Sequence, residues 1–216
     1  MDLPILLIVI IALALIFDFI NGFHDAANSI ATIVSTKVLT PFQAVLWAAV
    51  WNFAAFFLAM YVVGEFKIGN TIAKSVNEDF INLHVIFAGL IAAIAWNLLT
   101  WWFGIPSSSS HTLIGGFMGS ALMFAFVKEY DTVAALHQNA GFFVNLSEAF
   151  KNLLQLSVVK YDKVLPIFLF IFLAPLIGMI ISIIITLIIV SIFKKSNPHK
   201  AESFFKKMQL ASSAFL

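Results

Sequence analysis

The 216-residue sequence contains no cysteine and no arginine, and only 11% of its residues are charged. Without cysteine the chain can form neither a disulfide nor a thiolate metal site. Soluble domains carry about 25% charged residues, so this chain has too few polar side chains to cover a water-soluble globule. Its net charge of +1 provides no basic surface for nucleic acid. These shortages exclude a soluble enzyme, a nucleic-acid-binding protein and a disordered chain.

Apolar side chains are abundant instead, at 62% of the sequence, with a mean hydropathy of +1.01. A transmembrane helix needs about 20 largely apolar residues, and four stretches meet this need: 3–23, 41–63, 84–103 and 164–193. A fifth, 107–127, has a polar start, and its hydropathy leaves open whether it crosses the membrane or turns back halfway. We predict an all-α integral membrane protein with about five transmembrane or re-entrant helical segments.

The remaining segments differ from the spans in charge. Residues 128–163 carry eight charges, and their apolar residues recur at roughly helical spacing. This pattern predicts one or two amphipathic helices on the membrane surface, with a solvated loop as the alternative. Residues 194–216 form a lysine-rich tail that the positive-inside rule places in the cytoplasm. We therefore divide the chain into a transmembrane region, 1–193, and this tail.

A first polar cluster lies at the end of the first apolar stretch. Asp18, Asn21, Asp25 and Asn28 are spaced at i, i+3, i+7 and i+10, so a helix places them on one stripe. Carboxylates at membrane depth usually line a water-filled path or bind ions, and oxygen ligands suit Na⁺, Mg²⁺ or a proton. Gly22 can let the helix unwind and expose backbone carbonyls to a cation. The alternative is a helix end whose polar residues lie among the lipid headgroups.

A second polar cluster follows Pro106, which stops the preceding helix. It consists of four serines, a histidine and a threonine: Ser107, Ser108, Ser109, Ser110, His111 and Thr112. A helix start with free N–H groups and hydroxyls favours an anion, whereas the simpler reading is a polar connection between two spans. Ser107 and His111, at i and i+4, are also compatible with the nucleophile and base of an intramembrane serine hydrolase. No nucleophile motif such as G-x-S-x-G accompanies them, so we predict that the protein is not an enzyme.

Other polar residues within the spans are isolated: Gln43, Asn52, Asn97 and Thr100. Each by itself is typical of a hydrogen bond between packed helices. No lysine lies inside any span, so an anion at the serine cluster would need a co-bound cation or protonated carboxylates to offset its charge. An anion site beside an acidic stripe therefore indicates cation-coupled anion transport.

Both clusters resemble the signatures of the inorganic phosphate transporter (PiT) family, and of its bacterial low-affinity Pit-like subgroup in particular. The first signature is approximately G-A-N-D-x-A-N, followed by T-x-V and L-T-P; here it reads Asn21-Gly22-Phe23-His24-Asp25-Ala26-Ala27-Asn28, then Thr32, Val34 and Leu39-Thr40-Pro41. The second is P-V-S-T-T-H followed by glycines; here it reads Pro106-Ser107-Ser108-Ser109-Ser110-His111, then Gly115, Gly116 and Gly119. The chain departs from the family at His24, where most members have Asn, and at Ser109-Ser110, which replace Thr-Thr.

The resemblance implies import of inorganic phosphate across the bacterial inner membrane by secondary transport. Phosphate would bind to Ser107–Ser110, Thr112 and Asn28, and the coupling cation or proton to Asp25, Asn21 and Asp18. His111 and His24 would orient the loops, with no cofactor and no permanent metal. The subgroup implies proton coupling and transport of a neutral metal–phosphate complex, and sodium coupling is the alternative.

The family is built from two inverted repeats, each with both signatures, whereas this sequence has one copy of each. The resemblance therefore implies an N-terminal half that meets a second repeat or a partner chain. The alternative from another class is a non-transporting half that acts only as an assembly subunit.

Overall fold

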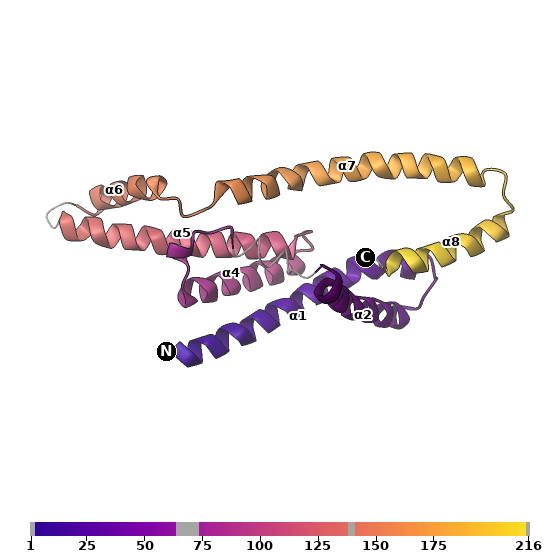
Figure 1. Cartoon of the computed structure of the whole chain (residues 1–216), viewed down its shortest axis with the longest axis horizontal. Coiled ribbons are helices and arrows are strands. Elements are labelled where there is room, and N and C mark those ends of the chain that lie inside the picture. Colours follow the sequence, from indigo (N-terminus) through magenta and orange to yellow (C-terminus); the bar gives the residue numbers. More distant parts are fainter. Residues whose placement is uncertain (1–2, 64–73, 138–140, 215–216) are drawn as a thin grey trace. The chain divides into compact units, whose positions relative to one another are not determined.

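The structure, a computed structural model, describes residues 3–63, 74–137 and 141–214 (Figure 1). Within these residues the chain is helical and contains no strand, apart from one isolated antiparallel bridge between Val76 and Val159. The elements in order are α1 (Leu3–Ser35), α2 (Pro41–Leu58), the π-helical turn η1 (Ala59–Val63), the 3₁₀ turn η2 (Glu78–Phe80), α4 (Leu83–Trp102), α5 (Ser109–Leu136), α6 (Phe142–Gln155), α7 (Tyr161–Phe193) and α8 (Pro198–Ser213).

Five of these helices are long and apolar enough to cross a membrane: α1, α2 with its extension to Tyr61, α4, α5 and α7. The predicted all-α membrane fold is therefore confirmed. The fifth stretch, left open in the sequence, is a continuous helix of 28 residues, which at 1.5 Å per residue is about 42 Å long and exceeds a hydrocarbon core of about 30 Å. Residues 128–136, grouped with the amphipathic segment in the sequence, continue α5.

The chain divides into two compact units. The α4–α5 unit comprises residues 1–22 and 67–165, and the α2–α8 unit comprises residues 23–66 and 166–216. One boundary falls within α1, after Gly22, and the other falls within α7, after Leu165.

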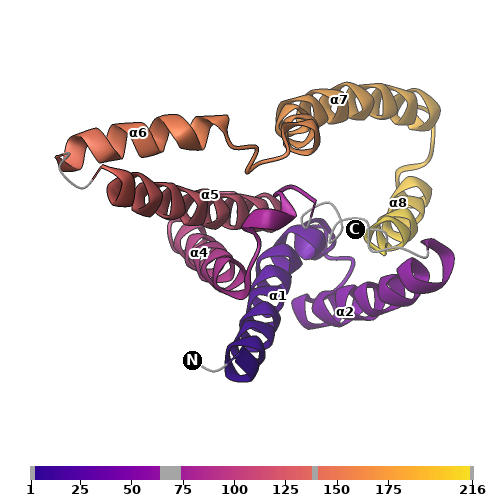
Figure 2. The ribbon, with the colours of Figure 1, turned by 60° about the vertical axis from the view of Figure 1, so that its left-hand side comes forward.

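In the α4–α5 unit, α4 and α5 lie side by side in both views (Figures 1 and 2). Their backbones approach very closely at two glycines, since a Cβ added to Gly116 would lie 2.6 Å from the carbonyl oxygen of Gly89. One turn further, Ser120 Oγ donates a hydrogen bond of 2.9 Å to the Val85 carbonyl oxygen. Small residues permit this approach, and in lipid it is packing and interhelical hydrogen bonds that hold helices together.

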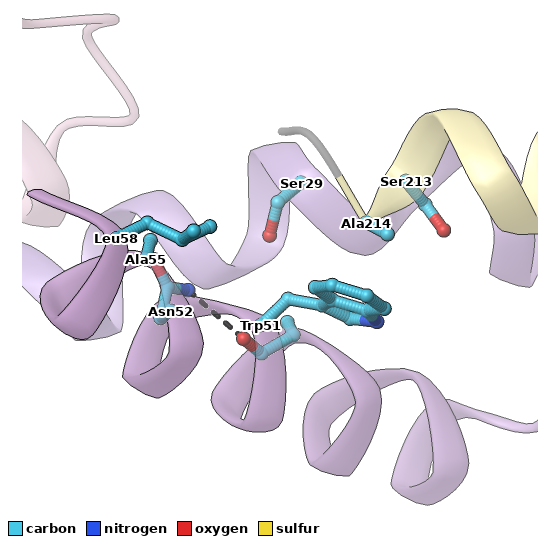
Figure 3. A pocket seen from close by; sticks show the side chains of 8 residues that line it. Ser29, Trp51, Asn52, Ala55, Leu58, Ser213 and Ala214 are labelled. Atoms are coloured by element: carbon cyan, nitrogen blue, oxygen red, sulfur yellow. Dashed lines mark hydrogen bonds between the residues drawn. The ribbon is translucent and has the colours of Figure 1, made fainter. Parts of the chain in front are cut away.

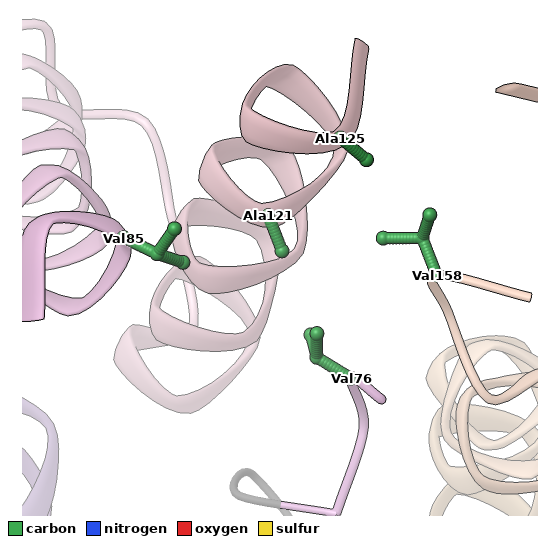
Figure 4. Close-up of a cluster of buried hydrophobic side chains, with 5 residues drawn as sticks. All are labelled: Val76, Val85, Ala121, Ala125 and Val158. Atoms are coloured by element: carbon green, nitrogen blue, oxygen red, sulfur yellow. The ribbon is translucent and has the colours of Figure 1, made fainter. Parts of the chain in front are cut away.

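Two apolar clusters complete this unit. The first joins Val76, Val85, Ala121, Ala125 and Val158, and connects α4 and α5 to the segments that form the isolated bridge (Figure 4). The second joins Leu6 and Ile10 of α1 to Leu90 of α4, with Phe17 and Leu113 among the side chains packed against them. Side chains between Leu6 and Phe17 of α1 thus pack against α4 and the beginning of α5.

Helix α6 packs against α5 in the same unit. Its buried residues are Asn145 and Ala149, whereas Phe143 and Leu154 are among its most exposed side chains. A helix with one face on protein and exposed apolar side chains elsewhere suits the membrane surface. That location for α6 stays a prediction.

In the α2–α8 unit, helix starts are marked by side-chain caps. Thr40 and Gln43 form a capping box at the start of α2, and Asn197 caps α8. Helix α8 is joined to its neighbours by a hydrogen bond of 3.2 Å from Trp47 Nε1 to Ser213 Oγ and by Phe204, whose ring packs on that of Phe193. The predicted tail is therefore largely helical.

The glycine contact yields a direct test. We expect Gly116→Ala to lower the stability of the protein by about 1–3 kcal/mol, the usual cost of overpacking, because its methyl group would meet the Gly89 carbonyl. Gly115→Ala is the matched control, since a Cβ there has nothing within 4 Å. The control should be neutral or slightly stabilising because alanine favours helix. Thermal unfolding in detergent measures both, and equal stability of the two variants would contradict the contact.

Candidate functional site

The acidic stripe lies on one unbroken helix, because α1 runs from Leu3 to Ser35 through Gly22. The helix neither unwinds at Gly22 nor ends among the four polar residues, so the suggestion of exposed carbonyl ligands at Gly22 is not supported by the structure. Asp18 and Asp25 are exposed and Asn21 is partly buried. Asn28 belongs to the helix, but its side chain lies outside the described part of the structure.

The serine cluster is positioned by a tight stop at the end of α4. Gly104 has a φ of 64°, a left-handed conformation that favours glycine. The Gly104 N–H bonds the Trp101 carbonyl at 3.1 Å, and the Ile105 N–H bonds the Thr100 carbonyl at 2.8 Å. This pair of hydrogen bonds is a Schellman motif, which closes the helix. Pro106 follows, and the chain turns directly into the start of α5.

Helix α5 then begins at Ser109, with Ser108 as its N-cap. The Ser108 hydroxyl accepts from the His111 N–H at 3.5 Å, and the Thr112 hydroxyl donates to the Ser108 carbonyl at 2.9 Å and lies 3.3 Å from that of Ser107. Ser110 and the His111 side chain are exposed. The result is a hydroxyl-rich helix N-terminus, which carries a partial positive charge and favours anions.

The two polar clusters meet through one short hydrogen bond within the α4–α5 unit. Ser109 Oγ donates to Asn21 Oδ1, although the two residues are 88 positions apart in the sequence. This contact joins α1 to the start of α5 and puts an amide of the first cluster against a hydroxyl of the second.

Asp25 and His24 belong to the α2–α8 unit. The exposed Asp25 has no part in the Asn21–Ser109 contact. The His24 Nε2 atom is buried and has no hydrogen-bond partner among the described residues, and the ring lies edge-on to Phe23 with 6.4 Å between centroids. Whether His24 orients a loop stays a prediction.

Two polar residues of α4, for which the sequence predicts only packing roles, are buried in the structure. Thr100 is buried, and its hydroxyl bonds the carbonyls of Trp96 and Asn97 on its own helix, as expected for a packing residue. Asn97 is only 1% exposed, and its Nδ2 has no partner in the described part of the chain. The feature of the sequence that could have drawn attention to Asn97 is a polar amide inside an otherwise apolar span.

A separate pocket lies within the α2–α8 unit between α1, α2 and α8 (Figure 3). Its lining includes the hydroxyls of Ser29 and Ser213 and the side chains of Trp51 and Asn52. The Asn52 amide donates to the Ala48 carbonyl at 3.1 Å, which fits the predicted packing role, whereas the Trp51 Nε1 is buried without an acceptor among the described residues.

Comparison with known proteins identifies the family. The model of the phosphate transporter family matches residues 21–215, which include both signatures and every helix from α2 to α8. The chain belongs to the phosphate transporter family. The predicted resemblance is confirmed, and with the five spanning helices it gives a multi-pass protein of the bacterial inner membrane.

The relatives are bacterial proteins named as transporters. A probable low-affinity inorganic phosphate transporter of Bacillus subtilis is 39% identical over 219 residues, covering 98% of this chain and 54% of the relative. Its Rhizobium meliloti counterpart is 55% identical over 118 residues, 54% of this chain and 34% of the relative. The low-affinity inorganic phosphate transporter PitA of Escherichia coli is 39% identical over 140 residues, 62% of this chain and 27% of the relative. The chain spans about half the length of the Bacillus subtilis relative and a smaller share of the other two. No solved structure matches the chain.

The Asn21–Ser109 contact can be tested by a double-mutant cycle. We expect Asn21→Ala and Ser109→Ala to lose about 1 kcal/mol of stability each, and their combination to show a coupling energy of about 0.6 kcal/mol, the average for such pairs in membranes. Ser110→Ala, at an exposed neighbour, combined with Asn21→Ala should give strictly additive losses. Unfolding in detergent measures all variants, and additivity for the Asn21–Ser109 pair would refute the contact.

Proposed function

We propose that this chain is the first repeat of a secondary transporter that imports inorganic phosphate together with a cation. The observation that carries the proposal is the hydrogen bond between Asn21 and Ser109, since it joins the helix of the acidic stripe to the hydroxyl-rich start of α5. The acceptor-rich side chains on α1 and the donor-rich groups at the start of α5 suit the cation and the anion of such a symport, respectively. The names of the relatives support phosphate as the anion.

Phosphate binding in this proposal uses hydroxyls and helix N–H groups. Ser107 and Ser108 precede α5, and Ser109, Ser110 and Thr112 lie in its first turn. Asn28 is proposed as a further ligand from the resemblance to the family signature alone. Tetrahedral oxyanions accept several hydrogen bonds at once, and the helix terminus adds favourable partial charge. His111, whose backbone N–H donates to the Ser108 cap, would hold the loop in place.

Charge balance sets the role of the acidic residues. The apolar stretches 3–23, 41–63, 84–103, 107–127 and 164–193 contain no lysine, so phosphate held by neutral donors keeps an uncompensated negative charge that is costly in a low-dielectric site. A proton or cation at Asp25, with Asn21 and Asp18 on the same stripe, would cancel the charge of the carboxylate and so remove its repulsion of the phosphate. We propose a proton as the coupling ion, with sodium as the alternative, and phosphate crossing either free or as a metal complex. The transporter needs no cofactor and acts as a carrier, not as a hydrolase.

We further propose that a second repeat or a partner chain completes the site. In inverted-repeat transporters the substrate lies between two halves, each with its own broken or polar helix ends. Asp18 and Asp25 are exposed on an apolar helix, where unsatisfied polar groups cost several kcal/mol in lipid. A second polar surface would cover them. A half that serves only in assembly is the competing function.

Liposome transport separates these two functions. We expect residues 1–216 alone to show no phosphate uptake above background, and co-reconstitution with the second half of a relative to restore it, because only the pair encloses the site. Radiolabelled phosphate uptake measures both. Saturable uptake by the single chain would contradict the need for a partner, and an inactive pair that still assembles would favour the assembly subunit.

The role of Asp25 is tested in the active pair. We expect Asp25→Asn to reduce phosphate accumulation driven by an imposed pH gradient by about tenfold, a coupling energy of about 1.4 kcal/mol, because the amide cannot exchange a proton. Asp131→Asn, at an exposed acid on α5 outside both signatures, should leave accumulation unchanged. Full gradient-driven uptake in the Asp25 variant would show that another group carries the coupling ion.

A further inference from the structure

The amide of Asn97 is the most unusual buried group in the α4–α5 unit. The residue is 1% exposed, and its Nδ2, which carries two N–H donors, meets no acceptor among the described residues. Buried donors are nearly always paired, and an exception calls for an explanation such as a missing ligand. By contrast, Thr100 on the next turn is fully bonded within its own helix.

The register of α4 against α5 shows what Asn97 faces. Val85 is bonded to Ser120, and Gly89 approaches Gly116, so a step of four along α4 matches a step of four back along α5. Ala93 also lies against Gly116, since its backbone nitrogen and Cβ lie 3.3 and 3.5 Å from a Cβ added there, so Gly116 packs between Gly89 and Ala93. Asn97 follows Ala93 by one turn on the same buried stripe. The antiparallel pairing therefore sets it opposite the turn from Ser108 to Thr112, at the N-terminus of α5.

The apolar cluster that joins α1 to α4 also indicates that Asn97 lies near the start of α5. Phe17, Leu90 and Leu113 pack in one cluster. Asn21 lies one turn beyond Phe17, Asn97 lies two turns beyond Leu90, and Ser109 lies one turn before Leu113. With Ser109 bonded to Asn21, the polar residues of three helices continue directly from the apolar cluster.

We propose that Asn97 is a further binding residue whose amide N–H groups donate to the oxyanion at the start of α5. The proposal rests on the function proposed above, in which that oxyanion is inorganic phosphate. The nearby hydroxyls already have hydrogen-bond partners: Ser108 with the His111 N–H, Ser109 with Asn21, and Thr112 with the Ser108 carbonyl. An acceptor-rich ligand satisfies the Asn97 donors, and a neutral amide adds hydrogen bonds where the span offers no lysine.

The test uses the reconstituted pair of halves and measures the KM for inorganic phosphate together with thermal stability in detergent. Asn97→Leu should raise the KM about tenfold while stability stays equal or rises, because an unpaired polar group is replaced by an apolar side chain of similar size. A purely structural role predicts lower stability instead. Asn97→Asp, which loses the donors and adds negative charge, should raise the KM further.

The matched control is Asn145→Leu, at a buried asparagine of α6 whose Oδ1 is also without a partner in the described chain. It should leave the KM unchanged. An unchanged KM in Asn97→Leu would overturn the assignment, as would a changed dependence on the coupling cation with the phosphate KM intact. An unmodified pair without phosphate uptake would overturn the proposed function itself, and this assignment with it.

Discussion

The close approach of α4 and α5 at Gly89 and Gly116 is the constraint on which the α4–α5 unit depends. With backbone against backbone at one turn, neither helix can slide or rotate without a clash. The contact fixes an antiparallel register, and the register decides which residues of α4 face the first turn of α5. The Schellman stop at Gly104 and the cap at Ser108 then need only a short connection to return the chain to the same level.

Hydropathy predicted the helices well where apolar residues are continuous and poorly where they are not. The span from Ser109 was uncertain because its first turn is polar, and its end was placed too early because Lys128, Glu129 and Asp131 interrupt the apolar pattern. Helical backbone hydrogen bonds form whether the side chains are polar or apolar, so α5 continues through these charged residues to Leu136. The same reason explains why α1 passes through its polar stripe without unwinding at Gly22.

The candidate site was predicted as two sets of residues, but not as a set of contacts. Residue type and spacing pointed to Asn21 and to Ser109, yet nothing in a single sequence pairs residues 88 positions apart. Nor could the sequence show that Gly116, rather than Gly115 or Gly119, is the glycine at the crossing. The sequence also could not distinguish Asn97, because an isolated amide in a span usually makes a packing hydrogen bond. It differs from Thr100 in that its buried Nδ2 has no partner among the residues that the structure describes.

The donors at the start of α5 suit a transporter better than a charged site would. A lysine or arginine at depth would hold a phosphate strongly and would itself be costly to bury once phosphate leaves. Hydroxyls, helix N–H groups and an amide lose little when the anion departs, since the hydroxyls return to bonds with one another, as Ser107 and Thr112 do. In the proposed function, the remaining charge is balanced by an ion that arrives and leaves with the phosphate. A neutral donor set and an acidic stripe on the adjoining helix are thus two parts of one physical requirement.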